Sequence, residues 1–236
     1  KFRLHCAQDM YEIVYFASPG FAEVSRFCLE ISGLEWKNTV VDWDQYTEMK
    51  NQGELPWGYL PIVRTPHGTV AESNALLRYT AALAGLEPED LYVRAKVDEL
   101  VEVINGWREH FMPTFSIENI DEKISARKAM FVEGGSMDTA LNNISAVFER
   151  STTGWLANTE DMTIADIKAF MDTFMMFSGQ FDGITANMLG NYPTLLAFHE
   201  KMSNDSRVKK YYDTDDEMRW VFRPGAFEKF GNSQHI

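Results

Sequence analysis

Residues 11–33 read Tyr-Glu-Ile-Val-Tyr-Phe-Ala-Ser-Pro-Gly-Phe-Ala-Glu-Val-Ser-Arg-Phe-Cys-Leu-Glu-Ile-Ser-Gly and join a strand-like segment to a helix-like one. Residues 11–16 are a short β-prone run, which Ser18-Pro19-Gly20 interrupts. Apolar residues then recur at helical spacing as far as Gly33, namely Phe21, Val24, Cys28 and Ile31. The segment therefore predicts a β-strand followed directly by an amphipathic helix.

The alternation of strand and helix continues to residue 84. Residues 65–68 have the composition of a tight turn between two strand-length segments, which suits an antiparallel hairpin. We expect further strands at 36–42, 60–64 and 67–70, and further helices at 44–51 and 73–84. The resulting order, βαβαββα over residues 11–84, predicts an α+β domain.

The pattern changes after residue 84. Residues 85–92 are rich in Pro and acidic side chains, as expected of a linker, and residues 93–222 show only helical periodicity. In this second, all-α domain we expect a central buried helix from Ile164 to Phe177, opened by a capping box at Thr163-Ile-Ala-Asp166. A further helix is predicted to open at Tyr192-Pro193. Residues 1–10 and 223–236 are predicted to be terminal extensions.

Composition and charge exclude several classes of partner. The 236 residues carry 22 basic and 35 acidic side chains, a net charge of −13, so neither nucleic acid nor an anionic membrane surface is an expected partner. No apolar run is long enough for a membrane span.

The chain is also poor in metal ligands. Its two cysteines, Cys6 and Cys28, cannot form a disulfide framework, and we expect no metal. The acidic residues Asp213, Asp215, Asp216 and Glu217 are interpreted as a solvated face. These features favour a cytoplasmic location, with an organellar one after cleavage of a targeting peptide as the alternative.

Three segments carry a resemblance to a known family. They are Tyr15-Phe16 with Glu23 eight residues after the tyrosine, Leu60-Pro61-Ile62-Val63, and Glu72-Ser73-Asn-Ala-Leu-Leu-Arg-Tyr79. In this order and spacing they resemble the cytosolic glutathione transferases, most of all the sigma class, over about residues 10–222. The resemblance implies a thioredoxin-like N-terminal domain followed by an all-helical domain. It also implies glutathione as substrate or cofactor, a hydrophobic electrophile as second substrate, and a homodimer.

A transferase of this kind must present the glutathione sulfur as a thiolate, because the thiol is a poor nucleophile. Tyr15 ends the first predicted strand just before a helix, so its hydroxyl could donate a hydrogen bond to the sulfur while the helix dipole favours the negative charge. The resemblance places the family's catalytic tyrosine here. Ser18 lies where serine-type transferases of the same fold carry their activating residue, and it is the alternative; the spacing from Tyr15 to Glu23 favours the tyrosine.

The resemblance also assigns residues that hold glutathione. The Leu60 backbone, before Pro61, would pair with the cysteinyl part of the ligand as a short added strand. Ser73, at a helix N-terminus, suits the γ-glutamyl carboxylate, and Glu72 suits the ammonium group. On the preceding helix, Tyr46 and Lys50 lie where sigma-class proteins use a tryptophan and a lysine to contact the glycine carboxylate. An ordinary helix cap at Ser73 and an exposed helix lysine at Lys50 remain the simpler alternatives.

Two positions depart from the sigma pattern. Phe21 replaces an arginine near the catalytic tyrosine, and Gly106 replaces an aspartate that would come from the partner subunit. For the electrophile we name Trp107, Arg108 and Phe111 as candidates, with core packing as the alternative. The predicted function is conjugation of glutathione to hydrophobic electrophiles. The alternatives are a non-catalytic structural subunit, as in the lens S-crystallins, a glutathione-dependent isomerase, and a carrier of hydrophobic molecules.

Overall fold

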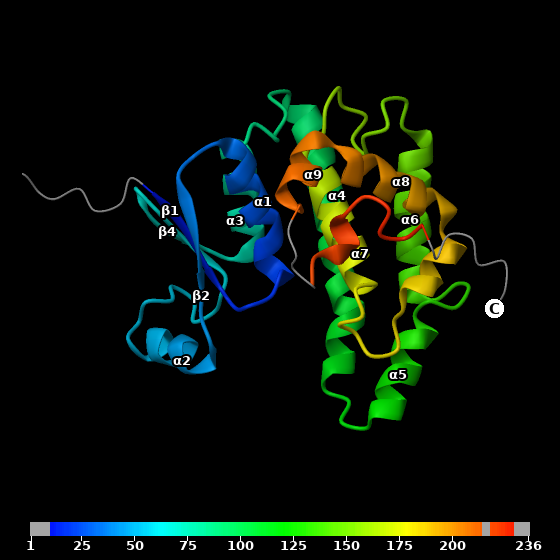
Figure 1. The fold of residues 1–236 in the computed structure, drawn as a ribbon, viewed down its shortest axis with the longest axis horizontal. Coiled ribbons are helices and arrows are strands. Elements are labelled where there is room, and N and C mark those ends of the chain that lie inside the picture. The colour runs from blue at the N-terminus through cyan, green and yellow to red at the C-terminus, as the bar shows by residue number, and fades with distance from the viewer. Residues whose placement is uncertain (1–9, 214–217, 229–236) are drawn as a thin grey trace, which may run out of the picture. The chain divides into compact units, whose positions relative to one another are not determined.

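The computed structural model describes residues 10–213 and 218–228, which form two compact units divided between Glu87 and Pro88. The division falls inside the 85–92 stretch interpreted as a linker. Figure 1 shows the first unit as a sheet with helices and the second as helical. Cys6, the residues 215–217 of the acidic cluster, most of the N-terminal extension and the end of the C-terminal one lie outside the described residues.

The first unit is built on a four-stranded mixed sheet with strand order β2-β1-β3-β4. Strands β1 (Tyr11–Tyr15) and β2 (Trp36–Val40) are parallel, and β1 pairs antiparallel with β3 (Ile62–Thr65), which forms a hairpin with β4 (Gly68–Ala71). Helices α1 (Glu23–Ser32), α2 (Trp43–Asn51) and α3 (Ser73–Leu83) complete the order βαβαββα. The predicted α+β fold with its thioredoxin-like first part is confirmed.

The period-two alternation of β1 gives the sheet two apolar faces. Ile13 and Tyr15 pack on one face with residues of α1 and α3, whereas Val14 packs on the other with side chains that include those of α2. A short 3₁₀ helix, η1 (Gly20–Ala22), runs directly into α1, so the N-terminal end of this helical segment lies just after the end of β1. The fold thereby brings the Tyr15 side chain to the start of a helix.

The second unit contains α4 (Leu91–Phe115), α5 (Ile120–Ala129), α6 (Ser136–Arg150), α7 (Ile164–Met176), α8 (Pro193–Asn204) and α9 (Ser206–Tyr211), with 3₁₀ helices η2 (Ala186–Asn191) and η3 (Trp220–Phe222). Helix α7 is the central buried helix that the sequence predicts, and it contacts α4, α8 and η3. The capping box at its start is also present, since Asp166 accepts a hydrogen bond from the Thr163 N–H at 2.8 Å. Helix α5 escaped prediction because its sequence is polar nearly all round and only Arg127 is buried.

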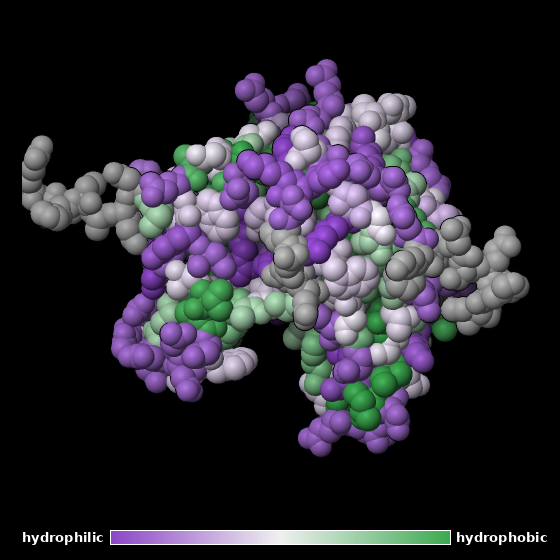
Figure 2. All heavy atoms as spheres, viewed as in Figure 1, coloured by the Kyte–Doolittle hydropathy of each residue, from purple (hydrophilic) through white to green (hydrophobic). Residues whose placement is uncertain are grey.

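The visible surface of the units is mainly hydrophilic, with apolar residues in small patches, one of them over α5 (Figure 2). Phe115 and Ile120, at the turn between α4 and α5, are both about half exposed. No helix among the described residues is long and apolar enough to cross a membrane.

Candidate functional site

Tyr15 is the last residue of β1 and is 7% exposed. The backbone N–H of Phe21, in the first turn of η1, donates a hydrogen bond of 3.4 Å to the Tyr15 hydroxyl oxygen. This contact polarises the hydroxyl and makes it a better donor to a third group. The same helix start favours a negative charge placed beside it.

Gly20 lies directly against the Tyr15 hydroxyl. A Cβ at this position would lie 2.8 Å from the Tyr15 hydroxyl oxygen and 2.9 Å from Cε1 of its ring. The φ angle of Gly20 is +41°, which disfavours residues with a side chain. From the sequence, Gly20 was predicted only as part of the break after the first strand, and its contact with Tyr15 required the folded chain.

Ser18, the alternative activator, lies close to the same glycine. Its Oγ is 3.3 Å from the position that a Gly20 Cβ would occupy. Its backbone N–H donates to Phe16 O at 2.7 Å, so the residue belongs to a tight turn after β1. The structure therefore brings both candidate activators to one place in the first unit.

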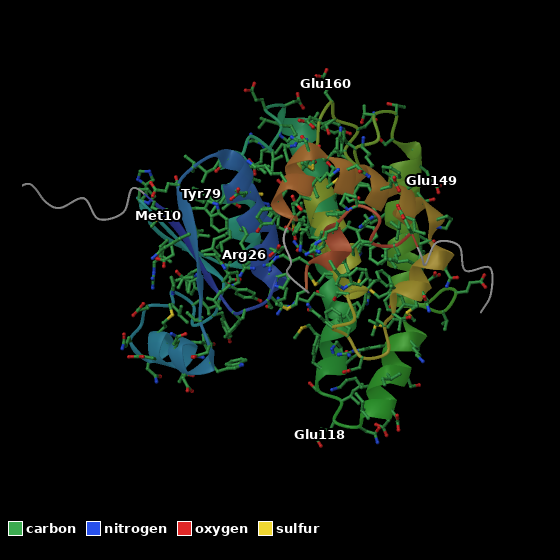
Figure 3. All side chains as sticks on the ribbon, viewed as in Figure 1. Met10, Arg26, Tyr79, Glu118, Glu149 and Glu160 are labelled. Atoms are coloured by element: carbon green, nitrogen blue, oxygen red, sulfur yellow. The ribbon has the colours of Figure 1, made fainter. Side chains whose placement is uncertain are left out.

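Arg26 is a buried cation next to this turn and is labelled in Figure 3. It projects from α1, and its Nη1 donates to Ser18 O at 2.8 Å and to Pro19 O at 3.1 Å. Nη1 also pairs with the Glu23 carboxylate at 3.1 Å, and the guanidinium carbon lies 5.6 Å from the centroid of the Tyr15 ring. Arg26 was not predicted from the sequence as a site residue. The available signal was a Glu and an Arg three residues apart at the start of the amphipathic helix α1.

Tyr46 and Lys50 lie on α2 in an aromatic surrounding. The Tyr46 hydroxyl donates to Gly58 O at 2.9 Å, so this hydroxyl is engaged by the loop before β3. The Tyr46 ring meets that of Phe16 edge-on at 5.5 Å. The Lys50 ammonium lies 5.9 Å from the ring centroid of Tyr46 and 5.5 Å from that of Tyr59, which leaves an exposed cation beside this loop.

Leu60 and Pro61 join that loop to β3 through a cis peptide bond. Among the described residues, no backbone group hydrogen-bonds to the N–H or C=O of Leu60. Leu60 is half-buried and Pro61 buried. The Leu60 backbone is thus available to an extended peptide ligand.

Glu72 and Ser73 stand at the start of α3. Glu72 has φ 71° and ψ 116°, a left-handed region that is costly for a residue other than glycine. It is the N-cap of α3, and no side chain among the described residues caps the helix there. The first N–H groups of this helix therefore remain available to an anion next to the Ser73 hydroxyl.

The candidate residues for the electrophile site, in the second unit, differ in their burial. Trp107 and Phe111 of α4 are buried, and the Phe111 ring contacts those of Phe131 and Phe181, as the core-packing alternative predicts. Arg108 is exposed. A Cβ at Gly106 would meet no atom within 4 Å. In the described part of the chain, no three His, Cys, Asp or Glu residues are grouped so that they could hold a metal ion.

Comparison with known proteins shows what this chain is similar to. Residues 105–215 match the family described as "Glutathione S-transferase, C-terminal domain". Glutathione S-transferase 3 of Caenorhabditis elegans is 23% identical over 214 residues, which cover 89% of this chain and 99% of the relative. The chain is therefore similar to glutathione S-transferases over most of its length.

Solved structures show that this chain has the expected transferase fold. Prostaglandin synthase D of Nilaparvata lugens matches with a TM-score of 0.75 at 19% identity, over 88% of this chain and 98% of the other. A monomeric glutathione S-transferase of the hookworm Necator americanus matches with a TM-score of 0.69 at 20% identity, over 88% and 98%.

Proposed function

We propose that the chain conjugates the glutathione thiolate to hydrophobic electrophiles, with the Tyr15 hydroxyl stabilising the sulfur. The observation that carries the proposal is the place of the Tyr15 hydroxyl, which accepts a hydrogen bond from the Phe21 N–H at the start of a helix. The similarity to glutathione S-transferases supports the reaction class. It does not favour the non-catalytic alternative.

The energy required is within reach of this arrangement. A thiol with a pKa of about 8.5 is only roughly 3% ionised at neutral pH. Lowering the pKa by about two units makes roughly three quarters of the sulfur reactive and requires about 2.7 kcal/mol of preferential thiolate stabilisation. A hydrogen bond to a charged acceptor contributes about 1.5–3 kcal/mol, and a helix N-terminus adds about 0.3–1 kcal/mol.

The rest of the first unit offers groups that match glutathione. The Leu60 backbone, which bonds to no described backbone group, would take the cysteinyl part. Ser73 with the start of α3 would take the γ-glutamyl carboxylate. Glu72, exposed beside them, would take the ammonium group. Lys50 would attract the glycine carboxylate. The Tyr46 hydroxyl already donates a hydrogen bond to Gly58 O, so in this proposal Tyr46 contacts glutathione through its ring.

The test is a comparison of Tyr15→Phe with Ser18→Ala, using chlorodinitrobenzene as electrophile. We expect Tyr15→Phe to lower kcat/KM by roughly tenfold to a hundredfold, since one hydrogen bond to the thiolate is lost. Ser18→Ala should lie within about threefold of the wild type. Full turnover by Tyr15→Phe would reject the tyrosine mechanism, and a large loss confined to Ser18→Ala would transfer the role to the serine.

Several finer assignments also remain proposals. We assign the chain to a sigma-like class and expect a homodimer, on the resemblance of its motifs. Light scattering on the full chain distinguishes this from the monomer described for the Necator relative. Arg108 remains the exposed candidate for contacts with the electrophile. A cytoplasmic location is proposed from the scarcity of cysteine and the acidic balance.

A further inference from the structure

The guanidinium group of Arg26 donates hydrogen bonds to several backbone carbonyls of one turn. Besides the bonds of Nη1 to Ser18 O and Pro19 O, its Nη2 donates to Phe16 O at 3.5 Å. Its Nε donates to the Asn38 side chain on β2 at 2.9 Å. One side chain thus holds the turn between β1 and η1 from within and anchors it to the neighbouring strand.

The charge of Arg26 is balanced where it is buried. The side chains of Arg26 and Glu23 are both almost fully buried, and their ion pair of 3.1 Å leaves little net charge. The pair is therefore a weak source of field at the ligand sulfur. What the arginine supplies here is its planar set of N–H donors, which fixes several acceptors in one geometry.

The turn that Arg26 holds also determines the surroundings of the Tyr15 hydroxyl. Its carbonyl partners, Ser18 and Pro19, immediately precede Gly20, against which the hydroxyl packs. Phe21, the next residue, donates its N–H to that hydroxyl. A shift of the turn would therefore move both the packing surface and the donor.

We propose that Arg26 is a positioning residue that acts through Tyr15, by fixing the turn of residues 16–20 so that Gly20 and the Phe21 N–H hold the Tyr15 hydroxyl in place for the sulfur. This inference rests on the proposed function. It assigns a role in activation to a side chain that has no place in the ligand contacts described above.

The decisive variant is Arg26→Lys, which keeps the charge but replaces the fork by a single ammonium. One ammonium cannot bond both to Asn38 on β2 and to the carbonyls of the turn in the same geometry. We expect the pKa of the bound glutathione thiol, read from its ultraviolet thiolate absorbance, to rise by about one unit. The value of kcat/KM should fall about tenfold or more, with the KM for glutathione changed less than about threefold.

Arg127→Lys is the matched control. Arg127 is as deeply buried as Arg26, but it lies on α5 in the second unit, where Nε donates to Thr114 Oγ1 at 3.1 Å and Nη1 to Asp182 Oδ2 at 3.3 Å. Its replacement should lower the melting temperature as the Arg26 variant does. The thiol pKa should stay at the wild-type value, because Arg127 bonds to Thr114 and Asp182 of its own unit.

The outcomes separate the inference from the proposed function. An unchanged thiol pKa in Arg26→Lys, or an equal rise in both lysine variants, overturns the positioning role. If Arg26→Lys does not fold, Asn38→Ala removes one anchor from an exposed position, and the pKa must then rise in the same direction by a smaller amount. Absence of the thiolate band in the wild type would refute the proposed function itself.

Discussion

Replacement of Gly20 by alanine tests the geometry of the candidate site most directly. The new Cβ would stand 2.8 Å from the Tyr15 hydroxyl oxygen, whereas ordinary contact begins near 3.4 Å, so one of the two must move by about 0.6 Å. The Phe21 N–H already reaches the hydroxyl at only 3.4 Å, so a shift of this size breaks the bond. Misplacement by about 1 Å costs up to about a hundredfold in rate, and we expect kcat/KM to fall between about tenfold and a hundredfold.

The substitution also costs stability, and a control is needed to separate the two effects. An alanine at φ +41° is strained by about 1–2 kcal/mol. Gly33, at the C-terminal end of α1, has φ +71°, and a Cβ there meets no atom within 4 Å. Gly33→Ala should therefore carry a similar strain of about 1 kcal/mol without touching Tyr15.

The assay measures chlorodinitrobenzene conjugation and urea unfolding for both variants. We expect both to be less stable, with turnover and the thiolate band reduced only in Gly20→Ala. If Gly20→Ala keeps kcat/KM within about twofold of the wild type, the close packing of Gly20 on the hydroxyl has no catalytic consequence. Equal losses of activity in both variants would trace the effect to instability.

Two further predictions concern the second unit. Asp166 is fully buried and accepts hydrogen bonds from the N–H groups of Leu156 and Thr163. Asp166→Ala should therefore lower the free energy of unfolding in urea by about 3 kcal/mol. A loss below about 1 kcal/mol would show that water replaces the carboxylate. Burial lowers the pKa of His199 from 6.5 to about 4, although its bond to Val221 O opposes the shift. The folded protein therefore keeps His199 neutral. The contribution of His199 to the free energy of unfolding is complete above pH 6.5 and declines by about 3 kcal/mol as the pH falls to about 4. Urea unfolding at neutral pH and near pH 4.5 should show a smaller decline in His199→Gln, and parallel declines would contradict the assignment.

Most of the elements followed from local patterns, and the differences have physical causes. The apolar spacing of α1 and the turn residues around it correctly indicated a strand, a break and a helix. The capping box before α7 was readable because its partners lie three residues apart. Helices α5 and α9 were missed, since short or polar helices carry little periodicity and are held by their packing.

The sequence by itself determined the order of elements in the first unit, the central buried helix of the second, and the position of Tyr15 at the end of a strand. Such features depend on residues that are neighbours along the chain. The tertiary structure alone decided that Gly20 packs against the Tyr15 hydroxyl and that Arg26 joins Asn38 to the turn before η1. It also decided that the Trp107 and Phe111 rings face the interior. These contacts depend on how a helix rests on a sheet or on other helices, and no spacing within one element encodes that placement.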